Sequence, residues 1–165
     1  MVAENVCVEG KDDKPGSFQL SSEPSRCLTG IKLRHRSGKM VCSLILGVVL
    51  ADGVWGCSLM DRPLNMLVTD VDNNVLLPEH QSTQYANNAG FYYDLPGYNP
   101  TSPELTLLAS PNMSLHLQPG NSTLKIWYGE DLKNKDDGDN DKGICVDVFS
   151  RNKSCSGKRS ESDMF

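Results

Sequence analysis

The sequence lacks the short motifs that identify most enzymes. It contains no GxSxG nucleophile elbow, no HExxH zinc motif, no P-loop and no GxGxxG dinucleotide motif. Its three histidines, His35, His80 and His116, are far apart, and its six cysteines form no CxxC pair, which disfavours a zinc site. We therefore predict that the protein is not an enzyme, although its many carboxylates leave a small secreted hydrolase or a toxin as an alternative.

An excess of positive charge is also missing. The formal net charge is -5 and the pI is near 5.1, which argues against nucleic acid as the main partner. One basic run, KLRHRSGK at residues 32–39, is interpreted as the solvent-facing side of a strand. An anion or glycosaminoglycan patch is the alternative for this run.

The sequence has no uninterrupted apolar run long enough for a membrane span. Residues 40–60, MVCSLILGVVLADGVWGCSLM, come nearest, but Asp52 and Gly53 interrupt the run. A spanning helix needs about 20 mostly apolar residues, and a charge within it is costly in lipid. The β-branched residues and glycines of this segment instead predict two buried strands joined by an ADG turn.

The even number of cysteines predicts three disulfides. We favour a Cys42–Cys57 bridge, because a local link across neighbouring strands is easy to close, and the remaining pairings stay open. Cysteines near both ends of the chain indicate that one bridge ties the termini down. The six residues concerned are Cys7, Cys27, Cys42, Cys57, Cys145 and Cys155.

Three N-glycosylation sequons, at Asn112, Asn121 and Asn152, accompany the cysteines. Disulfides and sequons together indicate a secreted, extracellular glycoprotein. The first residues, MVAENVCVEGKDDKPG, are polar and do not resemble a signal peptide. A secreted protein with this start is expected to be a mature form or a fragment. The alternative is a cytosolic protein with six reduced thiols.

Short alternating apolar segments separated by turn signals dominate the chain. We count nine or ten of them and no convincing helix, a pattern typical of an all-β antiparallel β-sandwich or jelly roll. LNMLVTDVDNNVLLP predicts a hairpin with residues 72–74 at its tip. We expect an irregular lead-in over residues 1–15, a single disulfide-braced domain over 1–155 and a flexible polar tail over 156–165.

Acidic residues crowd the segment GEDLKNKDDGDNDKGICVDV at residues 129–148. Calcium takes six to eight oxygen ligands, so this loop is a candidate calcium site, although its spacing is not that of an EF-hand. Lys133, Lys135 and Lys142 are interleaved with the acids, and a solvated loop is the alternative. Asp147 is expected to face outward and could add a ligand. The candidate metal ligands are Glu130, Asp131, Asp136, Asp137, Asp139 and Asp141.

Aromatic residues beside amides and acids form a second candidate site. Sugar rings stack on exposed aromatic rings, while carboxylates and amides bind sugar hydroxyls. The alternative is that these rings pack in the core, which is our expectation for Trp55 and Trp127. The candidate ligand-binding residues are Tyr93, Asp94, Tyr98, Asn99 and Tyr128.

Two blocks of the sequence resemble known modules. GIKLRHRSGKMVC followed by WGC, and LKIWYGEDL followed by CVDVF, resemble cysteine-rich secreted modules of marine invertebrates. The second block is also similar to the final strands of galactose-binding-like jelly rolls of the discoidin type. That resemblance covers about a third of the chain and implies a β-sandwich, ligand contact through loops at one end, and often a bound calcium.

These patterns together predict a secreted, non-enzymatic binding or adhesion module. Its expected ligand is a glycan on a cell surface or matrix, with calcium organising the acidic loop, and an extracellular protein is a further possible partner. The alternative is a structural extracellular-matrix protein that acts through self-association. We expect no nucleic-acid partner and no membrane span.

Overall fold

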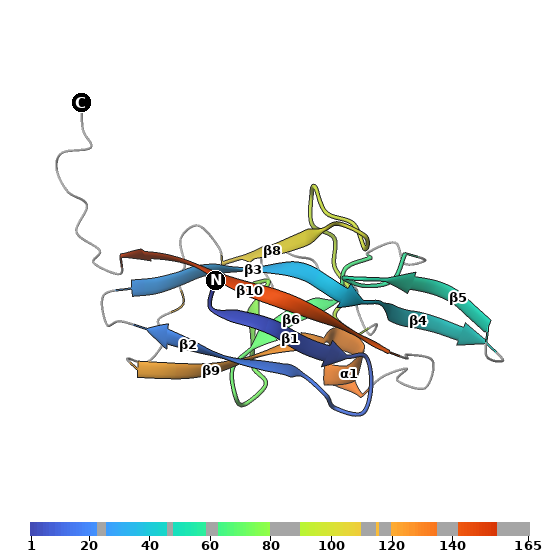
Figure 1. Ribbon diagram of the computed structural model, residues 1–165, viewed down its shortest axis with the longest axis horizontal. Coiled ribbons are helices and arrows are strands. Elements are labelled where there is room, and N and C mark those ends of the chain that lie inside the picture. The colour runs from blue at the N-terminus through green and yellow to red at the C-terminus, as the bar shows by residue number, and fades with distance from the viewer. Residues whose placement is uncertain are drawn as a thin grey trace.

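The computed structural model describes residues 1–22, 26–45, 48–58, 63–79, 90–109, 115, 120–134 and 142–154. These residues form ten strands and one short helix. The strands build two four-stranded antiparallel sheets and one two-stranded hairpin. The sheets lie face to face as a β-sandwich (Figure 1), so the predicted all-β antiparallel fold is confirmed.

The first sheet, sheet A, has the strand order β1-β10-β3-β8. These strands are β1 (Ala3–Glu9), β10 (Gly143–Ser154), β3 (Arg26–Gly38) and β8 (Glu104–Leu108). Alternate residues of each strand point to one face, as strand geometry requires. That inner face buries the apolar side chains of Val6, Val8, Ile31, Leu33, Leu105, Leu107, Ile144, Val146 and Val148.

The start of the chain is a strand and not the irregular lead-in that we expected. β1 pairs antiparallel with β10, with Cys7 opposite Cys145 and Val8 opposite Ile144. Only Val6 and Val8 alternate inward in β1, because the register shifts between Ala3 and Val6, and the outward Cys7 between them is not polar, so the sequence shows little strand periodicity here. Pairing with β10 satisfies the backbone groups of β1, and this pairing is set by a strand that lies more than a hundred residues away along the chain.

The second sheet, sheet B, has the strand order β2-β9-β6-β7. These strands are β2 (Gly16–Ser22), β9 (Gly120–Tyr128), β6 (Met66–Thr69) and β7 (Val75–Leu77). Phe18, Leu20, Leu124 and Ile126 are buried and complete the core between the sheets.

The predicted hairpin at residues 72–74 joins β6 to β7 and is confirmed. The carboxylate Oδ1 of Asp70 accepts the backbone N–H groups of Asp72 and Asn74, each at 2.9 Å. Asn73 takes the left-handed conformation at φ 66°, which asparagine tolerates better than most residues. Local turn chemistry therefore explains why this hairpin could be predicted from the sequence.

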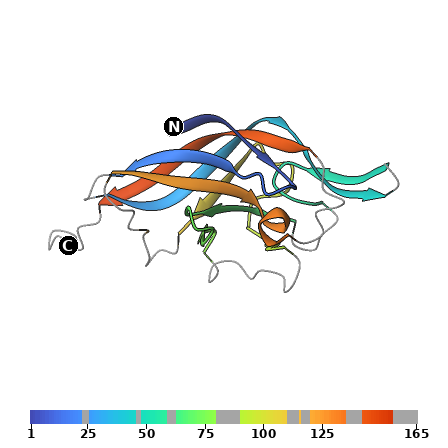
Figure 2. The same cartoon turned by 90° about the horizontal axis from the view of Figure 1, so that it is seen from below.

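The apolar segment that follows β3 forms a hairpin of β4 (Met40–Ile45) and β5 (Val48–Gly53). The ADG residues lie at the end of β5, so the prediction that they form the turn is wrong. The apolar sequence continues from the end of β4 into the start of β5, so no change of polarity marks the reversal between them. The hairpin extends from one end of the sandwich (Figures 1 and 2). Among the described residues, no helix is long and apolar enough to cross a membrane.

One short helix, α1 (Gly129–Lys133), was not expected. It follows β9 directly and ends at Asn134, which is left-handed at φ 50°. Glu130 and Asp131 lie in its first turn and Lys133 in its last, where each charge favours the helix dipole. A helix of five residues is too short to produce a periodic pattern in the sequence.

A disulfide joins Cys7 of β1 to Cys145 of β10, which are paired residues with Cα atoms 4.0 Å apart. It links positions 138 residues apart and so ties the first strand to the last, as the cysteines near the two ends indicated. Cys27 and Cys57 are also disulfide-bonded. The predicted Cys42–Cys57 pairing involves a side chain outside the described part, and residues 155–165 lie outside it as well.

Candidate functional site

One end of the sandwich gathers most of the predicted site residues. It contains α1, the β1–β2 turn at residues 10–15, the segments 53–58 and 63–65, and the loop at residues 90–103. The β4–β5 hairpin projects from the same end (Figure 2). We call this region the α1 end.

Asn65 connects three segments of the α1 end. Its side-chain amide is fully buried and donates to the carbonyl oxygen of Gly90 at 2.6 Å. Its amide oxygen accepts the backbone N–H groups of Gly129 and Glu130, the first two residues of α1. Tyr128, which precedes the helix, contributes no side-chain cap. Asn65, in the segment just before β6, therefore does from a distant part of the chain what an N-cap residue normally does locally.

Asp131 fastens α1 to the β1–β2 turn. Its carboxylate oxygens accept the backbone N–H groups of Asp13 at 2.9 Å and Lys14 at 3.1 Å. Burial raises the pKa of Asp131, the two backbone hydrogen bonds oppose that rise, and the nearby charges of Asp13 and Asp12 add to it. Both carboxylate oxygens of this predicted metal ligand thus already accept hydrogen bonds from the protein backbone.

Glu130 lies in a buried polar cluster beneath the same helix. Its side chain is almost completely covered, and Gly90 lies against it. The hydroxyls of Tyr92 and Tyr128 are 3.4 Å apart in this cluster. Burial raises the pKa of Tyr92, and Tyr128 and Glu130 raise it further, so Tyr92 stays protonated.

The other four predicted metal ligands, Asp136, Asp137, Asp139 and Asp141, lie outside the described residues. The two described ones, Glu130 and Asp131, are neighbours in α1. Within the described part of the chain, no group of three or more His, Cys, Asp or Glu residues is arranged to hold a metal ion. The predicted calcium site therefore stays a prediction.

The loop at residues 90–103 is anchored to the segment that follows β5. The indole Nε1 of Trp55 donates to the carbonyl oxygen of Ser102 at 2.7 Å, and the backbone N–H of Val54 donates to that of Pro100 at 2.7 Å. Trp55 is completely buried and Trp127 nearly so, in agreement with our expectation for both. These anchors fix the course of the loop across the α1 end.

The predicted sugar ligands divide into buried and surface residues. Tyr93 is completely buried, with its hydroxyl donating to the carbonyl oxygen of Met66 at 2.7 Å, and Tyr128 is completely buried as well. Asp94 and Asn99 are exposed and Tyr98 is half-buried, all within the anchored loop. Of the five predicted sugar ligands, only these last three are therefore accessible to a ligand.

Asn99 also organises the loop. Its side-chain oxygen accepts the backbone N–H and the hydroxyl of Thr101, each at 2.9 Å. Its own backbone N–H donates to the hydroxyl of Ser102 at 3.0 Å. These bonds hold the loop in a compact turn at the surface.

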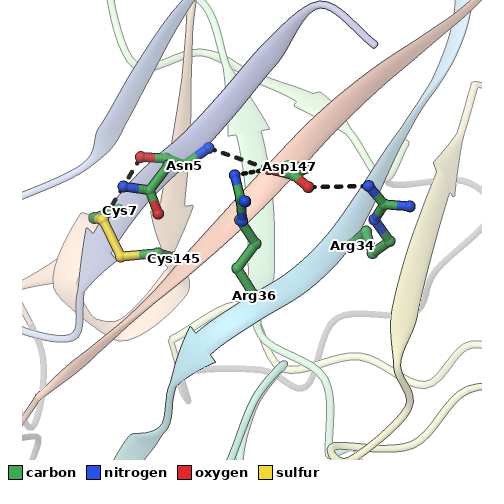
Figure 3. Close-up of polar contacts among 6 residues, drawn as sticks. All are labelled: Asn5, Cys7, Arg34, Arg36, Cys145 and Asp147. Atoms are coloured by element: carbon green, nitrogen blue, oxygen red, sulfur yellow. Dashed lines mark hydrogen bonds and ion pairs between the residues drawn. A yellow bond between two sulfur atoms is a disulfide. The ribbon is translucent and has the colours of Figure 1, made fainter.

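Asp147 lies on the outer face of sheet A, as expected, but its carboxylate is covered. Arg34 Nη2 and Arg36 Nη1 each lie 3.1 Å from one of its oxygens, and the backbone N–H of Asn5 donates at 3.2 Å (Figure 3). Burial acts to raise the pKa of Asp147, but these hydrogen bonds and the two positive charges outweigh it and lower the pKa. Asp147 therefore links β10 to β3 and to β1, and its carboxylate is not directed toward α1.

The sequons are placed only in part. Asn152 is exposed on β10, where a glycan has room. Asn121 belongs to β9, but its side chain is outside the described part, and Asn112 is outside it altogether. Glycosylation remains a prediction.

Sequence reasoning missed Asn65, although the sequence carries a signal for it. In the apolar stretch LNML, a lone amide between Leu64 and Met66 must find partners if the stretch is buried. The residues flanking it are completely buried, which identifies this stretch as core. Only the fold shows that the partners are the start of α1 and Gly90.

Comparison with solved structures identifies a similar protein. AJLec from the sea anemone Anthopleura japonica is 34% identical in sequence and superposes with a TM-score of 0.72. The match covers 90% of this chain and 92% of AJLec. No protein-family model matches the chain, and no curated protein sequence matches it.

Proposed function

Because the chain belongs to the same family as AJLec, whose name marks it as a lectin, we propose that it is a secreted, non-enzymatic glycan-binding protein. The similarity to AJLec over nearly the full length of both chains carries this proposal. The disulfide that joins β1 to β10 supports the secreted setting, because disulfides persist in oxidising compartments. Cell-surface or matrix glycans, and through them adhesion, are the targets that we propose.

The α1 end is the part of the molecule that we propose for sugar recognition. Asp94, Tyr98 and Asn99 offer a carboxylate, an aromatic ring and an amide from one anchored loop. Hydroxyl recognition needs donors and acceptors in fixed positions, because ordering a mobile loop would weaken binding. The bonds from Trp55 and Asn99 supply that order before the ligand arrives.

Calcium is the cofactor that we propose, with ligands from Asp136, Asp137, Asp139 and Asp141. The support for this site is the sequence, since the segment between Asn134 and Lys142 is dense in carboxylate oxygens, which calcium prefers. Thermal unfolding with calcium and with chelator tests it. At a hundredfold excess over Kd, a bound ion stabilises the fold by about 2.7 kcal/mol. An unchanged Tm would reject the calcium site.

A glycan array, probed in calcium and in chelator, tests the lectin function. We expect selective binding that free sugar competes away and that weakens in Asp94→Asn, Tyr98→Ala and Asn99→Ala variants. Asp72→Asn is the matched control for Asp94→Asn, because it removes an exposed carboxylate from the β6–β7 turn. If no glycan is bound but the protein assembles with concentration, the matrix-protein alternative replaces the lectin.

A further inference from the structure

The outer face of sheet A carries a row of cations that the proposed sugar site does not use. Lys32, Arg34 and Arg36 follow one another along β3, and Arg151 lies on the neighbouring β10. In the β10–β3 register, Lys32 is paired with Phe149 and Arg34 with Asp147, so all of these share the face opposite the core. We call the surface formed by Lys32, Arg34, Arg36, Phe149 and Arg151 the basic face.

The basic face has a surplus of positive charge in an acidic protein. It contains four cations, and two acids, Asp147 and Glu104, lie at positions paired with Arg34 on the neighbouring strands. The local charge is therefore +2, whereas the whole chain has a net charge of -5. Glu104 pairs with Lys32 at 3.3 Å, and both side chains remain substantially exposed. No ion pair to Arg151 is found among the described residues, and its side chain is exposed.

The central acid is recessed, while its partners are accessible. The Asp147 side chain is 6% exposed, but those of Arg34 and Arg36 are 54% and 45% exposed. Each guanidinium binds Asp147 through one nitrogen, and a guanidinium has five N–H donors. A molecule that approaches this face therefore meets guanidinium edges and not the carboxylate, which acts as their anchor (Figure 3).

Phe149 fixes two of the cations in position. Lys32 Nζ and the guanidinium carbon of Arg34 each lie 5.1 Å from the centre of its ring, within the range of a cation–π contact. Long basic side chains normally lose considerable entropy when they bind a ligand. Here the ring and the shared carboxylate have already restricted them, so less is lost on binding.

From these observations we propose that the basic face binds a sulfated polysaccharide. Arg pairs its planar fork with tetrahedral oxyanions, and alternate residues along a strand lie about 6.6 Å apart, so β3 offers a linear series of cations about 13 Å long. Such a narrow row suits a single linear polyanion. A DNA duplex is disfavoured, because the face offers no helix or ribbon to enter a groove and the rest of the chain is acidic.

The test uses heparin, its desulfated form and duplex DNA as probes. A Lys32→Gln/Arg151→Gln variant is the first choice, because it leaves both partners of Asp147 in place. We expect its heparin affinity to fall roughly two- to thirtyfold, the range for two exposed ion pairs. The slope of log affinity against log salt should fall by about one for each cation removed. A Lys14→Gln/Lys125→Gln variant removes the same charge from the β1–β2 turn and from β9 of sheet B, and it should bind heparin like the wild type.

A second variant tests the role of the guanidinium groups while keeping the positive charge. Arg34→Lys/Arg36→Lys keeps two cations beside Asp147 but removes the forks, and we expect weaker heparin binding with an unchanged salt slope. Equal losses in the two glutamine variants would show a non-specific charge effect and overturn the proposal, as would equal binding of DNA or of desulfated heparin. Binding to array glycans without sulfate should be unchanged in these variants. The proposal for the basic face and the proposal for the lectin site can therefore be rejected independently of each other.

Discussion

The amide oxygen of Asn65 accepts the backbone N–H of Glu130 at 3.2 Å, across a sequence separation of 65 residues. The same amide donates to Gly90, so one buried side chain joins the start of β6, the start of α1 and the start of the loop at residues 90–103. The loop that carries Asp94, Tyr98 and Asn99 is therefore coupled to the helix from which the acidic segment departs.

Replacing Asn65 by alanine should loosen the α1 end. The change removes the side-chain acceptor of the Glu130 N–H and the donor to the Gly90 carbonyl, and losing one such buried hydrogen-bond partner costs about 1–3 kcal/mol. We expect the free energy of unfolding, measured by chemical denaturation, to fall by at least this amount. Glycan binding should weaken as well. Asn152→Ala, on the exposed part of β10, should change neither quantity.

Replacing Asp131 by alanine separates a structural role from a metal-binding role. The N–H groups of Asp13 and Lys14 lose their acceptor, so the free energy of unfolding should fall by about 1–3 kcal/mol. The fall should be equal in calcium and in chelator. A fall seen only in calcium would identify Asp131 as a calcium ligand. Asp12→Asn, on the exposed side of the same turn, is the control: asparagine tolerates the left-handed backbone of this position (φ 68°), so the change should cost less than about 0.5 kcal/mol.

A Trp55→Phe variant tests whether the anchored loop matters for binding. Phenylalanine fills most of the buried site but cannot donate to the carbonyl of Ser102. We expect the free energy of unfolding to fall by about 1–3 kcal/mol, because the smaller ring leaves space and the Ser102 carbonyl loses its donor. Glycan affinity should fall as well, because the ligand must then order the loop. Titration calorimetry with a sugar identified on the array measures the glycan affinity. Unchanged affinity would show that the sugar binds elsewhere.

Removing the disulfide with a Cys7→Ser/Cys145→Ser variant should strongly destabilise the protein. The bridge closes a loop across 138 positions, and removing a native disulfide typically costs about 2–5 kcal/mol. Guanidinium unfolding under non-reducing conditions measures the loss. If the variant unfolds at the wild-type midpoint, the β1–β10 pairing holds the two ends without the bridge.

The ion pairs of Asp147 should make stability depend on pH. Its folded pKa is lowered, so ionised Asp147 adds stability above its unfolded pKa of about 3.9, and this contribution is lost as the pH falls through the folded value. We expect Asp147→Asn to be less stable than the wild type at pH 7. The difference should shrink below about pH 4. A difference that stays constant from pH 7 to pH 2 would contradict the ion-pair role.

Some features of this protein follow from the sequence alone. Alternating apolar residues in β3, β8, β9 and β10 predict strands, because the side-chain period of a strand is two. The DNN turn between β6 and β7 is also local, since the Asp70 carboxylate bonds to N–H groups only a few residues away. Local chemistry of this kind needs no knowledge of distant parts of the chain.

The tertiary structure decided the rest, because those features depend on partners far away in the sequence. β1 is a strand because β10 pairs with it, and Tyr93 and Tyr128 are core residues because the α1 end folds over them. Asp147 looks like any exposed acid of a strand until Arg34 and Arg36 lie against it. The sequence determined which residues alternate, whereas burial and charge pairing were determined by which strands meet.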